Sequence, residues 1–100
     1  MIEIVVTKAF DEWINDLRDR EGQRRILARI RHYAETGDAG DACSIGDGIR
    51  EMRFHFGPGY RVYYLILRKT IILLGGDKST QVADIRKAKQ YADYWKGQKL

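Results

Sequence analysis

The sequence predicts a single α+β domain over residues 1–100, with the element order strand, helix, helix, three antiparallel strands, helix. Apolar residues recur at three- and four-residue spacing in residues 10–17 and 26–34, which is typical of two amphipathic helices. Alternating and continuous apolar runs in residues 51–74 indicate the strands. Because a helical hairpin cannot bury its apolar stripes alone, we expect it to pack on one face of a twisted sheet.

The N-terminal half begins with a predicted strand of β-branched residues at Ile2–Val6, followed by Thr7, whose hydroxyl can cap a helix. Gly22 is expected to separate the two helices, and Gly37 to end the second. The apolar stripe of the first helix is Phe10, Trp13, Ile14 and Leu17, and that of the second is Ile26, Leu27, Ile30, Tyr33 and Ala34. Residues 37–48 are predicted to form the one long loop, a surface connection in preference to a functional lid.

A β-hairpin is predicted around the turn at residues 57–59. Pro58 presets the second position of a type II turn, and Gly59 can take the positive φ that the third position requires. Alternation between Glu51 and Phe56 directs the apolar side chains inward and the polar ones outward. The outward face is expected to carry Arg53, His55, Arg61 and Tyr63. Such a cationic and aromatic surface suits phosphate oxygens and stacked bases.

The last part of the chain is predicted to contain one buried strand and one helix. The continuous apolar run of residues 70–74 indicates a strand that is buried on both faces and that ends at Gly75 and Gly76. Ser79 or Thr80 can cap the helix that follows. Its buried stripe is expected to be Val82, Ile85, Ala88, Ala92 and Trp95, with Arg86, Lys87 and Lys89 on its solvent-exposed sides.

Charge is divided unevenly along the chain. The net charge is +4, yet residues 1–49 carry seven Lys/Arg and ten Asp/Glu, whereas residues 50–100 carry eleven and four. An anionic partner is therefore expected on the second half, although excess surface lysine also serves solubility alone. The single cysteine, Cys43, cannot form an internal disulfide, and no Cys/His cluster has metal-ligand spacing. We expect a reducing, cytoplasmic location, with neither a signal peptide nor a membrane span.

Two segments carry a specific pattern. They are EMRFHFGPGYRVY at residues 51–63 and LGGDKSTQ at residues 74–81, the latter followed by DIRKAK at residues 84–89. In a basic chain of this length, the two segments together resemble the RelE/ParE superfamily of small bacterial toxins. More narrowly, they look like its HigB-like branch, the addiction module killer proteins, and the resemblance covers nearly the whole chain.

The resemblance implies a RelE-like fold and the toxin of a type II toxin–antitoxin pair. RelE-type relatives cleave mRNA in the ribosomal decoding site, whereas ParE-type relatives inhibit DNA gyrase, and a shared fold does not decide between them. Arg53, Arg61 and Lys78 match basic positions of the ribonucleases, which favours a ribosome-dependent endoribonuclease that needs neither a metal nor another cofactor. The alternatives are a gyrase inhibitor and a non-toxic component that only binds its antitoxin.

The resemblance also implies the partners. These are a cognate antitoxin, often of the helix-turn-helix type, together with mRNA and the ribosome. Operator DNA would be bound only through the antitoxin complex, and no membrane is involved. An acidic segment of the antitoxin is expected to cover part of the basic half.

RNA cleavage by the substrate's own 2′-OH needs a base, positive charge on the phosphate and an acid. Guanidinium groups stay protonated, so Arg53 and Arg61 suit charge stabilisation. Lys78 can stabilise charge or transfer a proton, and His55 is the stronger candidate for proton transfer because imidazole titrates near neutrality. A His55 that is only an exposed polar residue fits the sequence equally well. Glu51 is expected to pair with Arg53 or Arg61, which would weaken the positive field.

The predicted RNA-binding residues extend beyond the catalytic candidates. They are Arg53, Arg61, Tyr63, Lys78, Arg86, Lys87 and Tyr91. Tyr91 and Tyr94 lie where some relatives carry stacking or proton-handling tyrosines. Either ring can instead pack on the core beside Trp95.

Overall fold

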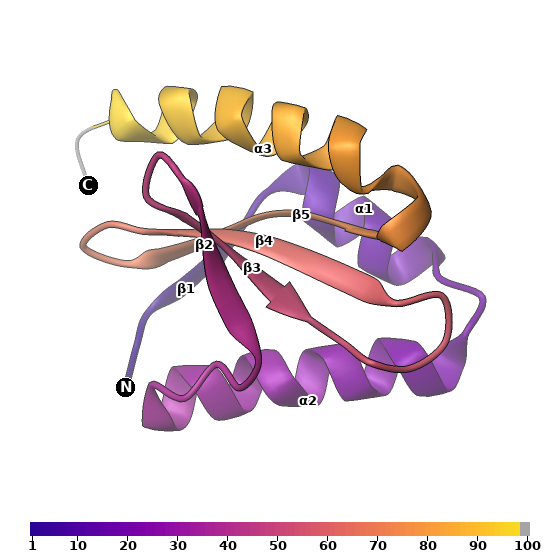
Figure 1. The fold of residues 1–100 in the computed structure, drawn as a ribbon. Coiled ribbons are helices and arrows are strands. Elements are labelled where there is room, and N and C mark those ends of the chain that lie inside the picture. Colours follow the sequence, from indigo (N-terminus) through magenta and orange to yellow (C-terminus); the bar gives the residue numbers. More distant parts are fainter. Residues whose placement is uncertain (99–100) are drawn as a thin grey trace.

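A computed structural model of the protein describes residues 1–98 (Figure 1). The elements are β1 (Ile4–Val6), α1 (Lys8–Asp16), α2 (Arg20–Thr36), β2 (Ala42–Gly46), β3 (Ile49–Arg53), β4 (Tyr60–Ile66), β5 (Thr70–Asp77), a 3₁₀ turn (Lys78–Thr80) and α3 (Gln81–Lys96). The five strands form one mixed sheet in the order β1-β5-β4-β3-β2, in which only β1 runs parallel to its neighbour. The predicted α+β class is confirmed.

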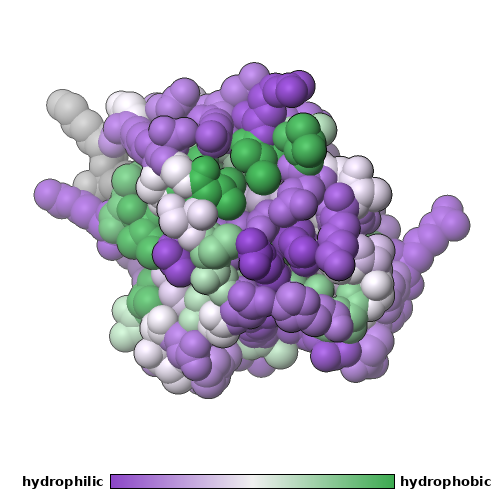
Figure 2. All heavy atoms as spheres, in the orientation of Figure 1, coloured by the Kyte–Doolittle hydropathy of each residue, from purple (hydrophilic) through white to green (hydrophobic). Residues whose placement is uncertain are grey.

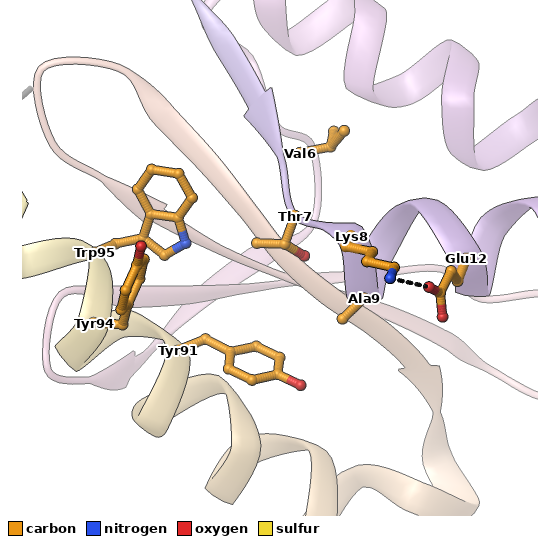
Figure 3. Close-up of a pocket in the computed structure, with 8 residues that line it drawn as sticks. All are labelled: Val6, Thr7, Lys8, Ala9, Glu12, Tyr91, Tyr94 and Trp95. Carbon is orange, nitrogen blue, oxygen red and sulfur yellow. Dashed lines mark ion pairs between the residues drawn. The ribbon is translucent and has the colours of Figure 1, made fainter.

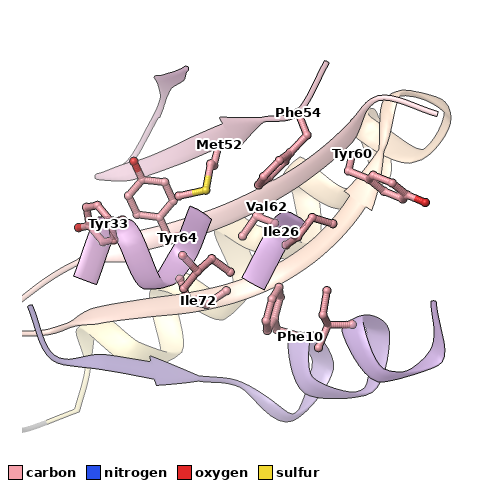
Figure 4. Packing of buried hydrophobic residues seen from close by; sticks show 11 residues of the cluster. Phe10, Ile26, Tyr33, Met52, Phe54, Tyr60, Val62, Tyr64 and Ile72 are labelled. Carbon is pink, nitrogen blue, oxygen red and sulfur yellow. The ribbon is translucent and has the colours of Figure 1, made fainter. Parts of the chain in front are cut away.

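Helices cover both faces of the sheet (Figure 1). The face under α1 and α2 holds the larger core, in which aromatic rings and branched side chains from the two helices meet those of β3, β4 and β5 (Figure 4). The members of this core are Phe10, Ile14, Ile26, Ile30, Tyr33, Met52, Phe54, Tyr60, Val62, Tyr64 and Ile72. The face under α3 holds Ile49, Tyr63, Leu65, Ile71, Leu73, Leu74, Ala88 and Ala92. The predicted packing of α1 and α2 on one face is therefore correct.

The predicted long loop contains a strand. β2 occupies Ala42–Gly46 and pairs antiparallel with β3, with Ala42 opposite Met52 and Cys43 opposite Glu51. Its small and polar residues give no alternation of their own, because this edge strand is stabilised mainly by hydrogen bonding to a neighbour. The connection from α2 to β2 is correspondingly short.

Gly22 lies within α2 and does not separate the helices. The side chain of Asp19 caps the helix by accepting a hydrogen bond from the Gly22 N–H at 2.9 Å. A Cβ at position 22 would lie 2.5 Å from Asp19 Oδ2 and 2.9 Å from Cε2 of Tyr60. The glycine therefore permits the close approach of Tyr60, whose hydroxyl donates to Asp19.

Gly75 and Gly76 do not end the last strand, because β5 continues to Asp77. A Cβ at Gly75 would lie 2.3 Å from the Trp13 ring on one face of the sheet. A Cβ at Gly76 would lie 1.8 Å from Asp84 Oδ2 on the other face. The two glycines therefore make room for a helix on each side.

The β3–β4 turn differs from the predicted turn by one residue. The Gly59 N–H donates to the Phe56 carbonyl at 3.0 Å, which places Gly57 and Pro58 at the two central positions. Gly57 has φ +56° and Gly59 has φ +76°. The positive φ predicted for Gly59 is confirmed, but Pro58 occupies the third turn position and not the second.

Helix α3 is tied to the sheet at both ends. At its start, the Gln81 side chain donates to the Glu51 carboxylate at 2.8 Å. At its middle, Lys89 Nζ lies 3.6 Å from Asp47 Oδ2, and at its end Lys96 Nζ donates to the Asp47 carbonyl at 2.5 Å. This orientation turns Val82 outward, so Val82 is exposed, contrary to the predicted stripe.

Other sequence predictions for the helices have mixed outcomes. Thr7 caps α1 by accepting from the Phe10 N–H, and Gly37 ends α2 in the left-handed conformation, as predicted. Leu27 is exposed and does not belong to the buried stripe.

None of the helices in residues 1–98 is long and apolar enough to cross a bilayer. Hydrophilic residues dominate the surface in the view of Figure 2, with small hydrophobic groups between them.

We predict that Gly75→Ala destabilises the protein by about 1–3 kcal/mol, because the new methyl group would overlap the partly buried Trp13 ring and displace α1. Urea unfolding of both proteins measures the difference. Gly97→Ala is the matched control, since its Cβ would meet nothing closer than 3.4 Å. An equal loss of stability in Gly75→Ala and Gly97→Ala would contradict the prediction that overlap with the Trp13 ring is the cause.

Candidate functional site

The four predicted catalytic residues lie at one end of the sheet, where β3 ends, β4 begins and β5 leads into α3. Arg53 is the register partner of Arg61 across the β3–β4 pair. His55 follows Arg53 by two residues. Lys78 begins the 3₁₀ turn after β5, and its N–H donates to the Gly59 carbonyl at 3.1 Å. The turn, the strand register and the end of β5 thus bring these residues together.

His55 and Lys78 line the same open cleft of about 300 Å³ beside the β3–β4 turn. The other lining residues are Phe54, Phe56, Gly57, Pro58 and Gly59. A Cβ at Gly59 would lie 3.0 Å from the Lys78 side chain, so the glycine lets the lysine stem pack closely on the turn. The cleft combines a flexible ammonium group and an imidazole, both exposed to solvent.

A buried carboxylate organises the arginine pair. Glu51 is 1% exposed, accepts from Arg53 Nε at 3.1 Å and lies 3.9 Å from Arg61 Nε. Burial raises the pKa of Glu51, but hydrogen bonds from Gln81 and Arg53 and the charge of Arg61 outweigh it, so this pKa lies below its ordinary value. The expected pairing of Glu51 is confirmed with both arginines, and it removes part of their positive field.

Arg61 and Tyr63 do not form the exposed surface that strand alternation predicts. Arg61 is 6% exposed, and its Nη1 donates to the carbonyls of Tyr60 at 3.1 Å and Gly59 at 3.3 Å. Tyr63 is fully buried under α3. Alternation assigns both residues to the correct face, but α3 covers that face. The ring of Tyr63 therefore cannot stack on a base in this conformation.

Two polar atoms of this covered face lack hydrogen-bond partners within residues 1–98. They are Arg61 Nε and the Tyr63 hydroxyl. Burial, and the nearby negative charge of Glu51, raise the pKa of Tyr63, which keeps its hydroxyl protonated. Arg53 is the more accessible of the two arginines, with 39% of its side chain exposed. Arg53 is therefore the guanidinium of the pair that a ligand can reach.

Sequence reasoning missed two residues beside His55. Asp41 Oδ2 is hydrogen-bonded to His55 Nε2, and this bond is the largest cause that holds the pKa of Asp41 below its ordinary value. Arg29 of α2 donates to the carbonyls of Ala39, Asp41 and Arg53. Nothing in the sequence indicates that these residues meet, because Arg29 lies on an amphipathic helix and Asp41 lies in a glycine-rich loop.

The predicted RNA-binding residues of α3 lie elsewhere. Lys87 and Tyr91 line the groove between α1 and α3, and Arg86 is exposed. Tyr91 and Tyr94 also line a larger pocket of about 570 Å³ with Trp95 and the start of α1 (Figure 3). The structure thus separates these aromatic residues from the His55–Lys78 cleft.

The fold and the site define a class of small α+β proteins with a five-stranded mixed sheet, two N-terminal helices and a C-terminal helix. An uncharacterized protein of Haemophilus influenzae (strain ATCC 51907 / DSM 11121 / KW20 / Rd) is 42% identical over 93 residues, which cover 91% of this chain and 93% of that protein. The chain belongs to the same family as this Haemophilus protein. No family model matches the chain.

A solved structure offers a more distant comparison. The solution structure of the conserved hypothetical protein HP0894 from Helicobacter pylori is 20% identical and covers 79% of this chain and 97% of its own. Its TM-score is 0.47.

We predict that Glu51→Gln lowers the free energy of unfolding at pH 7 by about 3 kcal/mol, because it leaves the buried Arg61 without a carboxylate. The folded-state pKa of Glu51 is lowered, so its contribution is present above the ordinary value of 4.5 and disappears as the pH falls through the folded-state pKa. Urea unfolding measures the free energy of unfolding of Glu51→Gln and of the unchanged protein. The difference between them should be smaller in acid than at pH 7.

The matched control is Glu35→Gln, which removes an exposed carboxylate from α2. It should leave the free energy of unfolding nearly unchanged. A Glu51→Gln protein as stable as the unchanged protein at pH 7 would contradict the structural role of this carboxylate.

Proposed function

We propose that this protein is the toxin of a type II toxin–antitoxin system and a ribosome-dependent endoribonuclease that stops translation by cleaving mRNA. The single observation that carries the proposal is the convergence of Arg53, His55 and Lys78 on one open end of the sheet. The element order and the motifs at residues 51–63 and 74–81 support membership of the RelE/ParE superfamily, in its HigB-like branch. The proposed place of action is the cytoplasm.

The three accessible groups supply what RNA cleavage requires. The 2′-OH of the substrate attacks the adjacent phosphorus, and the P–O5′ bond breaks to leave a 2′,3′-cyclic phosphate. His55 takes the proton of the 2′-OH, and Lys78 gives a proton to the departing 5′ oxygen. Arg53, half-exposed beside them, stabilises the charge that develops on the phosphate. Arg61 does not contact the substrate in this scheme. It stabilises the β3–β4 turn by donating hydrogen bonds to the carbonyls of Gly59 and Tyr60.

The ribosome would supply the geometry that this shallow cleft lacks. The cleft is open and its Lys78 and His55 side chains are exposed, so it does not by itself force an RNA strand into an in-line arrangement. Binding of the mRNA by the ribosome would provide that arrangement. A cognate antitoxin, often a helix-turn-helix protein, would cover the basic half with an acidic segment and so prevent entry. Operator DNA would be bound through that complex.

One observation favours a second candidate function, inhibition of DNA gyrase without hydrolysis. Glu51 neutralises part of the arginine pair, and Arg61 is buried, so fewer cations face solvent than the sequence suggests. A protein that inhibits by binding needs no such cations at the end of its sheet. The two candidates differ in which macromolecular synthesis stops first.

We predict that induced expression in a bacterial host stops incorporation of labelled amino acids within minutes, while incorporation of labelled thymidine initially continues.

Lys78→Ala should lower the rate of mRNA cleavage by about 10²-fold or more, since it removes a proton donor. Arg68→Ala is the matched control, because Arg68 is an exposed cation in the β4–β5 turn at the opposite end of the sheet. Circular dichroism checks that both variants fold.

Earlier loss of thymidine incorporation would replace the ribonuclease proposal with the gyrase candidate. Growth at the normal rate despite good expression of folded protein would point to a component that only binds its antitoxin. Full toxicity of Lys78→Ala would remove Lys78 from the proposed reaction.

A further inference from the structure

His55 and Asp41 come from different segments and meet beside the cleft. His55 follows β3, and Asp41 precedes β2 in the connection from α2. His55 Nε2 is hydrogen-bonded to Asp41 Oδ2. The side chain of His55 is 66% exposed and also lines the cleft that contains Lys78. The imidazole therefore has the carboxylate on one side and the open cleft on the other.

Arg29 fixes the backbone on both sides of this pair. Its Nε donates to the Ala39 carbonyl at 2.8 Å, its Nη2 donates to the Asp41 carbonyl at 2.6 Å, and its Nη1 donates to the Arg53 carbonyl. The Arg53 N–H also donates to the Asp41 carbonyl at 2.8 Å. The loop that carries Asp41 is thus attached to the end of β3 by several hydrogen bonds, independently of the side-chain contact. The planar guanidinium suits such a fixed set of acceptors.

The Asp41–His55 hydrogen bond has a consequence for proton transfer. When Nε2 carries a proton and donates it to a carboxylate, the lone pair of Nδ1 is available to accept another proton. The carboxylate also stabilises the imidazolium that then forms. Three cations lie near the pair: Arg53 from β3 and Arg29 from α2, with Lys78 lining the same cleft as His55. They oppose formation of the imidazolium, which increases the importance of Asp41.

We propose that Asp41 is a positioning residue that holds His55 in the Nε2–H tautomer, so that Nδ1 of His55 takes the proton from the 2′-OH of the RNA. The inference rests on the proposed function. In the balanced step, the 2′ oxygen forms a bond to phosphorus, its proton moves to Nδ1, the P–O5′ bond breaks and the 5′ oxygen receives a proton from Lys78. Arg29 supports this arrangement by fixing the loop that carries Asp41.

The first test measures the pairing without any activity. In His55→Ala, the pKa of the Asp41 carboxyl should rise toward its ordinary value of 3.8, because the hydrogen bond that lowers it is lost. Carbon NMR titration of the aspartates measures this shift, and nitrogen NMR of the imidazoles reports the tautomer of His55. His32, which lies 3.8 Å from Asp38, provides an internal reference in the same spectra. An unchanged Asp41 titration would overturn the inference.

The second test uses purified ribosomes programmed with a defined mRNA. Asp41→Asn should lower the single-turnover rate about tenfold to a hundredfold at saturating toxin, a part of what a general base contributes, and should leave KM nearly unchanged. Asp38→Asn is the matched control, since it removes the same charge from the same loop without touching His55. Cleavage by Asp41→Asn at the unchanged rate would overturn the inference alone. Absence of cleavage by the unchanged protein would overturn the proposed function, while the NMR titration would still decide the pairing.

Discussion

The burial of the Glu51 carboxylate is the constraint on which this end of the structure depends. A buried charge is strongly unfavourable unless it is paired and hydrogen-bonded. Here β3 supplies Arg53, β4 supplies Arg61, and the first turn of α3 supplies Gln81. The same contacts fix the arginine pair, the start of α3 and, through the carbonyls that Arg61 binds, the β3–β4 turn. Because that turn lines the cleft, the shape of the cleft depends on the Glu51 carboxylate.

Periodicity predicted the parts of the fold that bury apolar side chains. The helices and the three central strands follow because burial of one stripe or one face leaves a pattern in the sequence. β2 left no pattern, because its partner and not its composition makes it a strand. Gly22 and Gly75 were misread because a glycine that ends an element and one that admits a neighbouring ring look alike in sequence. Only the contacts with Tyr60 and Trp13 distinguish them.

The candidate site was predictable where strand register alone determines proximity, as for Arg53 and Arg61. Register does not say which helix covers a face, so the burial of Tyr63 under α3 could not be foreseen. Nor could the meeting of Arg29, Asp41 and His55, which depends on three segments far apart in the chain. Local sequence therefore identified the residue types at the site but not their accessibility.

The two attachments of α3 differ in their environment. At its start, the carboxylate that Gln81 binds is buried, whereas Asp47, Lys89 and Lys96, which attach its second half, are solvent-accessible. Dissolved ions screen exposed pairs far more than buried ones. Raising the ionic strength should therefore loosen α3 from its C-terminal end, with amide exchange increasing there first. The buried carboxylate and the apolar packing of Ala88 and Ala92 on the sheet would then hold the helix, because salt does not screen these buried contacts.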